Sequence, residues 1–412
     1  MLRVWNIVSL LIGLVLAGSV YASERAAENV QHVVLISIDG FRHDYIELHQ
    51  AARIAAIADQ GVRAKSLTPV YPANTFPNHL SIVTGLLPKH HGIVNNAFLD
   101  KQRPGEQGYA NYHMGKGFTD SSWLSGIPLW NLVELHGNKA ATYFWPESDA
   151  RINGLAPTYH YHYSKYADYQ QRIDQIVNWL SLPAASRPQF VAGYFSLVDT
   201  YGHEYGPQSS QTAQAVQRMD ALIGQLYERL QALPVAVNLV LVSDHGMLEV
   251  KPKAAVVVSQ LAIDKTQFAW VNNGSQLHIY ARSATPASEI RALATRLNQQ
   301  SALGFTVLSA AMRQQYHMDN RTLAGDILLQ VEAGRRFADT ADTPLDPGGH
   351  GYLPEHPDMG AVFVAAGPAF KQGKVLDKFN NLEIYPALAQ IMGLPLLNKI
   401  DGKLDKLAAG LH

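Results

Sequence analysis

Short apolar runs alternate with stretches of helical periodicity along most of the chain. Residues 33–38 form an almost continuous apolar run, which is typical of a strand buried on both faces of a sheet. Apolar residues at helical spacing predict a helix over 44–61, with Asp44 as its N-cap and Gly61 at its end. The same reasoning predicts strands over 190–198, 237–242 and 361–366, and helices over 207–230 and 386–392. This alternation predicts an α/β sandwich with a mainly parallel central sheet.

The segment 251–344 has a different pattern. It contains short candidate strands at 276–281 and 326–331, a candidate helix at 287–297, and no candidate ligands in series. We interpret this segment as a small inserted α+β subdomain within one catalytic domain that spans 23–412. The stretch 100–124 is rich in Gly, Tyr and Asn and is expected to be a surface excursion near the site.

Residues 1–22 are expected to be a signal peptide. Arg3 gives a positive start, 4–18 is mostly apolar, and Val20 and Ala22 place small residues two apart. The apolar run is shorter than the roughly 20 residues of a membrane span, although an uncleaved anchor is the alternative. We therefore expect an exported protein, periplasmic or secreted, without stable membrane insertion after cleavage.

The amino-acid composition excludes several kinds of site and partner. The chain has no cysteine, which excludes disulfides, thiolate zinc sites and a cysteine nucleophile. With 33 Lys and Arg against 34 Asp and Glu, it has no excess positive charge that would favour a nucleic-acid duplex as partner. Any metal ion must therefore be bound by histidines and carboxylates.

Aspartates follow three of the predicted strands. Asp39 follows the first strand, Asp199 the second, and Asp244-His245 the third. Open α/β sheets place their chemistry beyond the carboxyl ends of the strands. A single aspartate there is often only a helix cap or a turn residue, but three of them, two with a histidine close by, indicate a site.

The candidate metal ligands suit two ions. Asp199 and His203 are four residues apart, so one helical turn would direct both at the same ion, and His350 lies in a glycine-rich turn. Nitrogen and oxygen ligands of this kind suit zinc, and two ions could clamp an in-line displacement at phosphorus. The candidates are Asp39, Asp199, His203, Asp244, His245 and His350.

Thr75 is the candidate nucleophile. It stands where a helix N-cap belongs, followed by Pro77, and helix N-termini stabilise anions. A threonine before a proline is commonly only a structural cap. Its place among the candidate ligands favours the catalytic interpretation.

At these residues the chain resembles the nucleotide pyrophosphatase/phosphodiesterase family of the alkaline phosphatase superfamily. The resemblance runs in order from about residue 32 to about 395. Its motifs are Ile38-Asp39-Gly40-Phe41-Arg42, Asn74-Thr75-Phe76-Pro77-Asn78-His79, Gly92-Ile93-Val94-Asn95-Asn96, Phe144-Trp145-Pro146-Glu147-Ser148-Asp149, Asp199-Thr200-Tyr201-Gly202-His203, Ser243-Asp244-His245-Gly246-Met247 and His350-Gly351-Tyr352.

The resemblance implies an alkaline phosphatase-like sandwich with two zinc ions. One ion would be held by Asp199, His203 and His350; the other would be held by Asp39, Asp244 and His245, with Thr75 as ligand and nucleophile. Asn96 matches the asparagine that donates to a non-bridging phosphate oxygen. In the implied mechanism Thr75 attacks phosphorus, an alcohol leaves, and metal-activated water hydrolyses the phospho-threonine ester.

The family resemblance also implies residues that contact the substrate, but with a looser match than for the metal ligands. In family members with nucleotide substrates the aromatic residue after the nucleophile, here Phe76, stacks on the base, and Tyr159 falls in the region of the opposite wall. Simple packing under the helix is the alternative for Phe76. The other histidines, including His79, have no partner spacing and are interpreted as structural or exposed.

The expected function is hydrolysis of phosphodiester or phosphoanhydride bonds in small nucleotide-type substrates. A phosphomonoesterase is the first alternative, but its Lys-x-Arg pair is missing where Trp145-Pro146-Glu147-Ser148 stands. Sulfatases need a Cys or Ser motif that is absent. A phosphonoacetate hydrolase shares the threonine and the six ligands, and a catalytically dead binding protein is the alternative from another class. The sequence leaves the natural substrate and the oligomeric state open.

Overall fold

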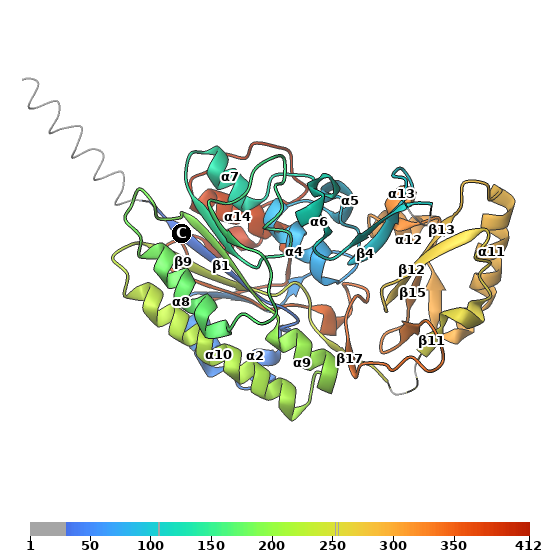
Figure 1. The fold of residues 1–412 in the computed structure, drawn as a ribbon. Coiled ribbons are helices and arrows are strands. Elements are labelled where there is room, and N and C mark those ends of the chain that lie inside the picture. Colours follow the sequence, from blue (N-terminus) through green and yellow to red (C-terminus); the bar gives the residue numbers. More distant parts are fainter. Residues whose placement is uncertain (1–29, 106–107, 252, 254) are drawn as a thin grey trace, which may run out of the picture.

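The large sheet organises the molecule. The computed structural model describes residues 30–105, 108–251, 253 and 255–412, so the expected signal peptide lies outside the described residues. Eight strands follow the order β19-β2-β18-β9-β1-β8-β6-β7 (Figure 1). Within this sheet only β18 runs antiparallel to its neighbours, so the predicted mainly parallel α/β sheet is confirmed. The strands are β1 (His32–Ile38), β2 (Val62–Ala64), β6 (Ala140–Tyr143), β7 (Tyr159–Tyr161), β8 (Phe190–Phe195), β9 (Val237–Val242), β18 (Phe363–Ala366) and β19 (Lys374–Leu376).

Helices cover both faces of this sheet and give three layers (Figure 1). Along β1, Val33 and Leu35 pack into one core, while Val34 and Ile36 pack into the other, as the two-residue period of a strand requires. Both faces are apolar, which explains the unbroken apolar run in the sequence. On one face lie α4 (Thr75–Thr84), α7 (Leu129–Leu135) and α14 (Ile384–Ile391); on the other lie α3 (Ala52–Asp59), α8 (Tyr169–Leu180) and α10 (Ser210–Gln231).

A second, antiparallel sheet lies within the segment 251–344. Its order is β12-β13-β15-β14, and it shares a separate apolar core with α11. Beside it β11 pairs with β16. The elements are β11 (Ala255–Val257), β12 (Phe268–Asn272), β13 (Gln276–Ala281), α11 (Ala287–Gln299), β14 (Phe305–Val307), β15 (Ile327–Val331) and β16 (Arg336–Ala338).

Two predicted elements differ from the structure. The helix predicted over 44–61 is interrupted at Gln50, whose φ of 58° is incompatible with a right-handed helix; beside it the His49 ring lies 2.9 Å from the Pro207 carbonyl. The strand predicted over 190–198 ends at Phe195, where a helix begins two residues later. The remaining elements are α2 (Tyr45–Leu48), α5 (Pro88–His91), α6 (Lys116–Thr119), α9 (Leu197–Tyr205), α12 (Ala310–Gln315), α13 (Arg321–Ala324), β3 (Leu67–Thr68), β4 (Ala97–Asp100), β5 (Ala110–His113), β10 (Leu248–Glu249), β17 (Gly348–Gly349) and β20 (Phe379–Asn380). Among the described residues no helix combines the length and apolarity needed to cross a membrane.

Candidate functional site

The predicted ligands meet at the carboxyl ends of three neighbouring strands. β9, β1 and β8 are adjacent and parallel, so the residues that follow them emerge at one edge. Asp39 follows β1 directly, and Asp244 and His245 follow β9. Asp199 does not follow β8 directly, as the sequence suggested, but lies in the first turn of α9, with His203 one turn later.

Glycines bring His350 to the same place. β17 pairs with β10, and a Cβ on Gly348 would lie 2.0 Å from the Gly202 carbonyl oxygen of α9. Gly351 has a φ of 88°, and a Cβ there would lie 2.5 Å from Asn74 Oδ1. Only glycine fits either position, so the turn can carry the His350 ring onto α9.

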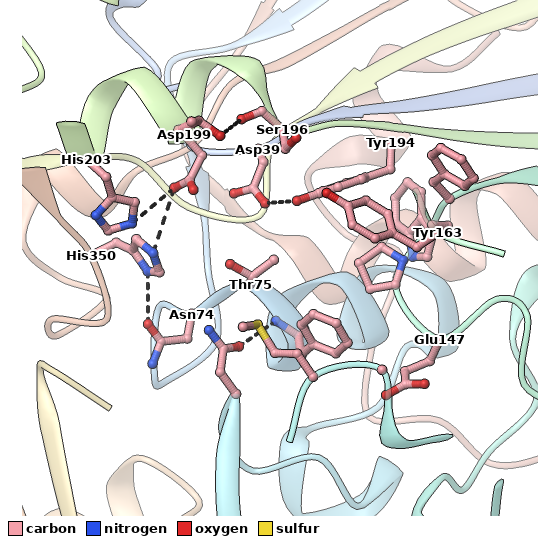
Figure 2. Close-up of a pocket in the computed structure, with 18 of the residues that line it drawn as sticks. Asp39, Asn74, Thr75, Glu147, Tyr163, Tyr194, Ser196, Asp199, His203 and His350 are labelled. Atoms are coloured by element: carbon pink, nitrogen blue, oxygen red, sulfur yellow. Dashed lines mark hydrogen bonds and ion pairs between the residues drawn. The ribbon is translucent and has the colours of Figure 1, made fainter. Parts of the chain in front are cut away.

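Carboxylates and imidazoles converge in two groups that could each hold a metal ion. Asp199, His203 and His350 form one group, and Asp39, Asp199 and His245 form the other, each with its donor atoms within 4.8 Å of one another. Asp199 Oδ1 lies 3.6 Å from His203 Nε2 and 3.8 Å from His350 Nε2 (Figure 2). Asp199 therefore belongs to both groups, where the sequence assigned it to one.

Asp244 completes the second group. Its Oδ2 lies 3.0 Å from His245 Nε2, and the same nitrogen lies 3.7 Å from Asp39 Oδ1. All six predicted ligands thus lie within one continuous cluster, and Asp39 and Asp244 are buried.

The ring hydrogen bonds leave the three Nε2 atoms free to act as ligands. His203 Nδ1 lies 3.0 Å from the Gly348 carbonyl, His245 Nδ1 lies 2.9 Å from the Gly246 carbonyl, and His350 Nδ1 lies 2.9 Å from Asn74 Oδ1. With Nδ1 donating to an oxygen, a neutral ring would present the lone pair of Nε2 to a carboxylate oxygen. A cation between such a lone pair and the carboxylate would stabilise this arrangement.

Unpaired carboxylate oxygens lead to the same conclusion. Asp39 Oδ1, Asp199 Oδ1 and Asp244 Oδ2 are buried and accept no hydrogen bond from the described residues. Burial, followed by the charges of Asp244 and Asp199, raises the pKa of Asp39 well above its ordinary value. Burial, with neighbouring histidines acting in the same direction, lowers the pKa of His350 well below its ordinary value. Such a cluster is compensated by divalent cations, and its nitrogen and oxygen donors suit zinc.

Thr75 lies at the start of α4, against this cluster. The N-cap is Asn74 and not Thr75, because Asn74 has the extended backbone of a cap and Thr75 is the first helical residue. Thr75 Oγ1 lies 3.3 Å from His245 Nε2, and the side chain lines the cavity. The hydroxyl therefore faces both the candidate ligands and the positive end of the helix dipole.

Asn96 is fixed beside the nucleophile candidate. Its Oδ1 accepts the backbone N–H of Phe76 at 2.9 Å, which holds the amide at the first turn of α4. Asn96 and Phe76 both line the cavity. The structure thus brings Thr75, Phe76 and Asn96 together at one helix N-terminus.

A cavity of about 550 Å³ opens over the cluster. Aromatic and apolar side chains form one part of its wall, and polar groups lie around the ligands (Figure 2). The lining residues of the apolar part are Phe76, Met114, Phe144, Trp145, Pro146, Tyr161 and Tyr163.

Tyr159 does not line this cavity, which corrects the expectation for it. Its hydroxyl donates to the Ser186 carbonyl at 2.9 Å, and its ring stacks on Trp179. Tyr163, four residues later, lines the cavity instead and has its ring 6.3 Å from that of Tyr194.

The sequence missed two buried residues that hold the cluster. Tyr194 donates its hydroxyl to Asp39 Oδ2 at 2.5 Å, and burial, then the charge of Asp39, raises its pKa well above the ordinary value, which keeps the donor protonated. His79 is fully buried, with Nδ1 2.9 Å from the Thr75 carbonyl and 3.4 Å from Asp244 Oδ2. Its position one helical turn after Thr75 was the only sequence signal for this contact.

The chain is similar in sequence to known phosphodiesterases and nucleotide pyrophosphatases. A family model described as type I phosphodiesterase/nucleotide pyrophosphatase matches residues 33–353. A venom phosphodiesterase of Macrovipera lebetinus is 33% identical over 375 residues, which cover 88% of this chain and 43% of the relative. The bovine ectonucleotide pyrophosphatase/phosphodiesterase family member 3 is also 33% identical, covering 87% of this chain and 42% of the relative. The chain thus spans less than half the length of these curated relatives.

Solved structures share the fold. An inactive form of murine ectonucleotide pyrophosphatase/phosphodiesterase 5, in complex with AMP, matches with a TM-score of 0.84 and 23% sequence identity. The match covers 93% of this chain and 100% of that one. The human counterpart matches with a TM-score of 0.85 and 24% identity. At these identities the likeness establishes the fold alone, and it agrees with the predicted alkaline phosphatase-like sandwich.

Proposed function

The chain belongs to the type I phosphodiesterase/nucleotide pyrophosphatase family, and from this premise we propose that it is a metal-dependent hydrolase of phosphodiester or phosphoanhydride bonds in nucleotide-type substrates. One observation carries the proposal. The Thr75 hydroxyl, at a helix N-terminus, faces a largely buried cluster of three carboxylates and three histidines, in which three carboxylate oxygens accept no hydrogen bond from the described residues.

Two zinc ions fit the donor set. Asp199, His203 and His350 would hold one ion. Asp39, Asp244 and His245, joined by Thr75, would hold the other. When bound, the ions would neutralise the charge of the phosphoryl group and favour the ionised form of the threonine hydroxyl.

Thr75 is proposed to make the first bond to phosphorus. Its Oγ attacks in line, an oxygen–phosphorus bond forms, and the bond to the leaving alcohol or phosphate breaks. Attack by water on the resulting phospho-threonine ester then releases the second product and restores the hydroxyl. The N-terminal end of α4 and the Asn96 amide lie where negative charge develops on the phosphoryl oxygens.

The apolar wall supports a nucleotide as the substrate. Phe76 and Tyr163 line the same cavity as Thr75, so a flat base could stack there while its phosphate reaches the hydroxyl. A nucleotide-bound relative of the same fold, the murine protein with AMP, is consistent with this proposal. We propose Tyr163 for the role that the family resemblance implied for Tyr159.

Export is proposed for the chain as well. The signal pattern in 1–22 lies outside the described residues, and the relatives include venom phosphodiesterases. N-terminal sequencing of the mature protein tests this, because cleavage after Ala22 predicts a chain that begins at Ser23.

Steady-state hydrolysis of three chromogenic esters tests the proposed activity. The substrates are p-nitrophenyl-TMP, bis-p-nitrophenyl phosphate and p-nitrophenyl phosphate, each with zinc and after chelation. We expect chelator-sensitive hydrolysis that is fastest for the nucleotide ester. Preference for the monoester would assign the protein to the phosphatases. No turnover of any of the three would leave a phosphonoacetate hydrolase or an inactive binding protein.

A further inference from the structure

Arg336 is a charged residue of the cavity wall to which the proposed chemistry gives no role. It begins β16, beside the second sheet, and lines the same cavity as Thr75. Among the described residues it has no carboxylate partner, and its Nη1 is buried without a hydrogen-bond acceptor. It is also the one arginine or lysine among the lining residues that the structure describes.

Other arginines near the core bind protein groups with part of the guanidinium. Arg172 Nε and Arg313 Nη1 also lack an acceptor, but neither residue lines the cavity. Arg42 binds Asp44 at 2.6 Å, and Arg172 donates to the Tyr194 carbonyl at 2.7 Å. The neighbour of Arg336 in sequence, Arg335, pairs with Glu332 at 3.3 Å. A buried guanidinium nitrogen without an acceptor is costly, so Arg336 is poised for an anion that enters the cavity.

Two glycines make room for the Arg336 side chain. A Cβ on Gly274 would lie 2.2 Å from its Nη2, and a Cβ on Gly349 would lie 2.7 Å from its Nη1. Gly349 directly precedes His350, so the guanidinium lies at the junction between the second sheet and the candidate metal cluster. Asn273, which lines the cavity from the same side, uses both ends of its amide on the Ala97 backbone. Arg336 is therefore the group on that side with hydrogen-bond donors to spare.

Arg336 and the aromatic wall lie on different sides of the nucleophile. Figure 2 shows His350 on one side of Thr75 and Tyr163 on the other. Arg336 is on the His350 side, because a Cβ on Gly349, the residue before His350, would lie 2.7 Å from its Nη1. A substrate whose base rests against the aromatic wall would thus extend past Thr75 towards Arg336.

We infer that Arg336 binds the anionic leaving group of the substrate, that is, the phosphate groups beyond the scissile phosphorus of a nucleoside polyphosphate. This inference rests on the proposed function and narrows it. A guanidinium is matched to phosphate oxygens by its planar fork of donors. The cavity would then favour phosphoanhydrides, whose leaving group carries phosphate charges, over esters whose leaving group carries no phosphate.

The ratio of two specificity constants tests this role. The kcat/KM for ATP is compared with that for p-nitrophenyl-TMP in the wild type, Arg336→Ala, Arg336→Lys and the matched control Arg335→Ala. We expect the ratio to fall at least ten-fold in Arg336→Ala, to recover partly in Arg336→Lys, and to stay unchanged in Arg335→Ala. An unchanged ratio in Arg336→Ala, or an equal fall in both constants, would overturn the inference.

A binding measurement separates this inference from the proposed activity. In a Thr75→Ala background, calorimetric titration with ATP and with AMP should show that Arg336→Ala weakens ATP at least ten-fold and AMP by much less. If the wild type hydrolyses neither substrate, the proposed activity fails, and this titration still decides the role of Arg336. Equal weakening of ATP and AMP would show that Arg336 acts only on the structure of the cavity.

Discussion

Removal of one hydroxyl, by Tyr194→Phe, should weaken metal binding without opening a cavity. The hydroxyl donates to Asp39 Oδ2 at 2.5 Å in a fully buried setting and leaves Asp39 Oδ1 for a cation. Hydrogen bonds to charged groups contribute about 1.5–3 kcal/mol, which corresponds to roughly 10- to 150-fold in an equilibrium constant. We expect zinc affinity to fall by a factor in this range, measured by competition with a chromophoric chelator, and turnover of p-nitrophenyl-TMP to fall with it at limiting zinc.

Tyr159→Phe is the matched control for this experiment. It removes a hydroxyl that bonds the Ser186 carbonyl at 2.9 Å, outside the cavity. Zinc affinity should therefore stay as in the wild type. If Tyr194→Phe binds zinc as tightly as the wild type while Asp39→Asn does not, the reasoning that Tyr194 positions the carboxylate is refuted.

Two further predictions concern groups around the cavity. Burial raises the pKa of Glu147 from 4.5 to about 7, although Tyr112 donates to it at 2.5 Å. The folded state therefore keeps a proton between these pH values that the unfolded chain loses, so stability should fall by up to about 3 kcal/mol as the pH rises through this window. Urea unfolding at pH 5 and pH 8 should show that the free energy of unfolding falls in the wild type and not in Glu147→Gln. An equal change in the two proteins would contradict this prediction. Asn74→Ala removes the acceptor of His350 Nδ1 at 2.9 Å, so zinc affinity should fall about 10- to 100-fold, whereas unchanged affinity would exclude Asn74 from orienting the ring.

The strands of the large sheet, and the residues that follow them, could be predicted because they depend on patterns within a few neighbouring residues. The apolar run of 33–38 reports a strand covered on both faces, and the order of parallel strands then fixes where Asp39 and Asp244 emerge. The four-residue spacing of Asp199 and His203 placed both on one helical face, which the structure shows in α9. These inferences needed no knowledge of distant contacts.

The residues that hold the ligands in place could not be predicted, because the two partners of each contact lie far apart in the sequence. Tyr194 meets Asp39 across 155 positions, and His350 meets Asn74 across 276. The expectation that Tyr159 lines the aromatic wall was wrong for another reason. Tyr159, Tyr161 and Tyr163 repeat every second residue, so no local pattern decides which ring enters the cavity.

Thr75→Ala, measured with its metal content, tests the central claim most directly. The variant lacks one methyl group and the hydroxyl at 3.3 Å from His245, so the six other candidate ligands should still hold zinc and the fold should remain. We predict a loss of p-nitrophenyl-TMP hydrolysis of at least 1,000-fold (removal of a nucleophile can cost on the order of 10⁶), with bound zinc retained. Thr84→Ala, at the opposite end of the same helix, should keep turnover. Turnover that survives in zinc-loaded Thr75→Ala would contradict the account.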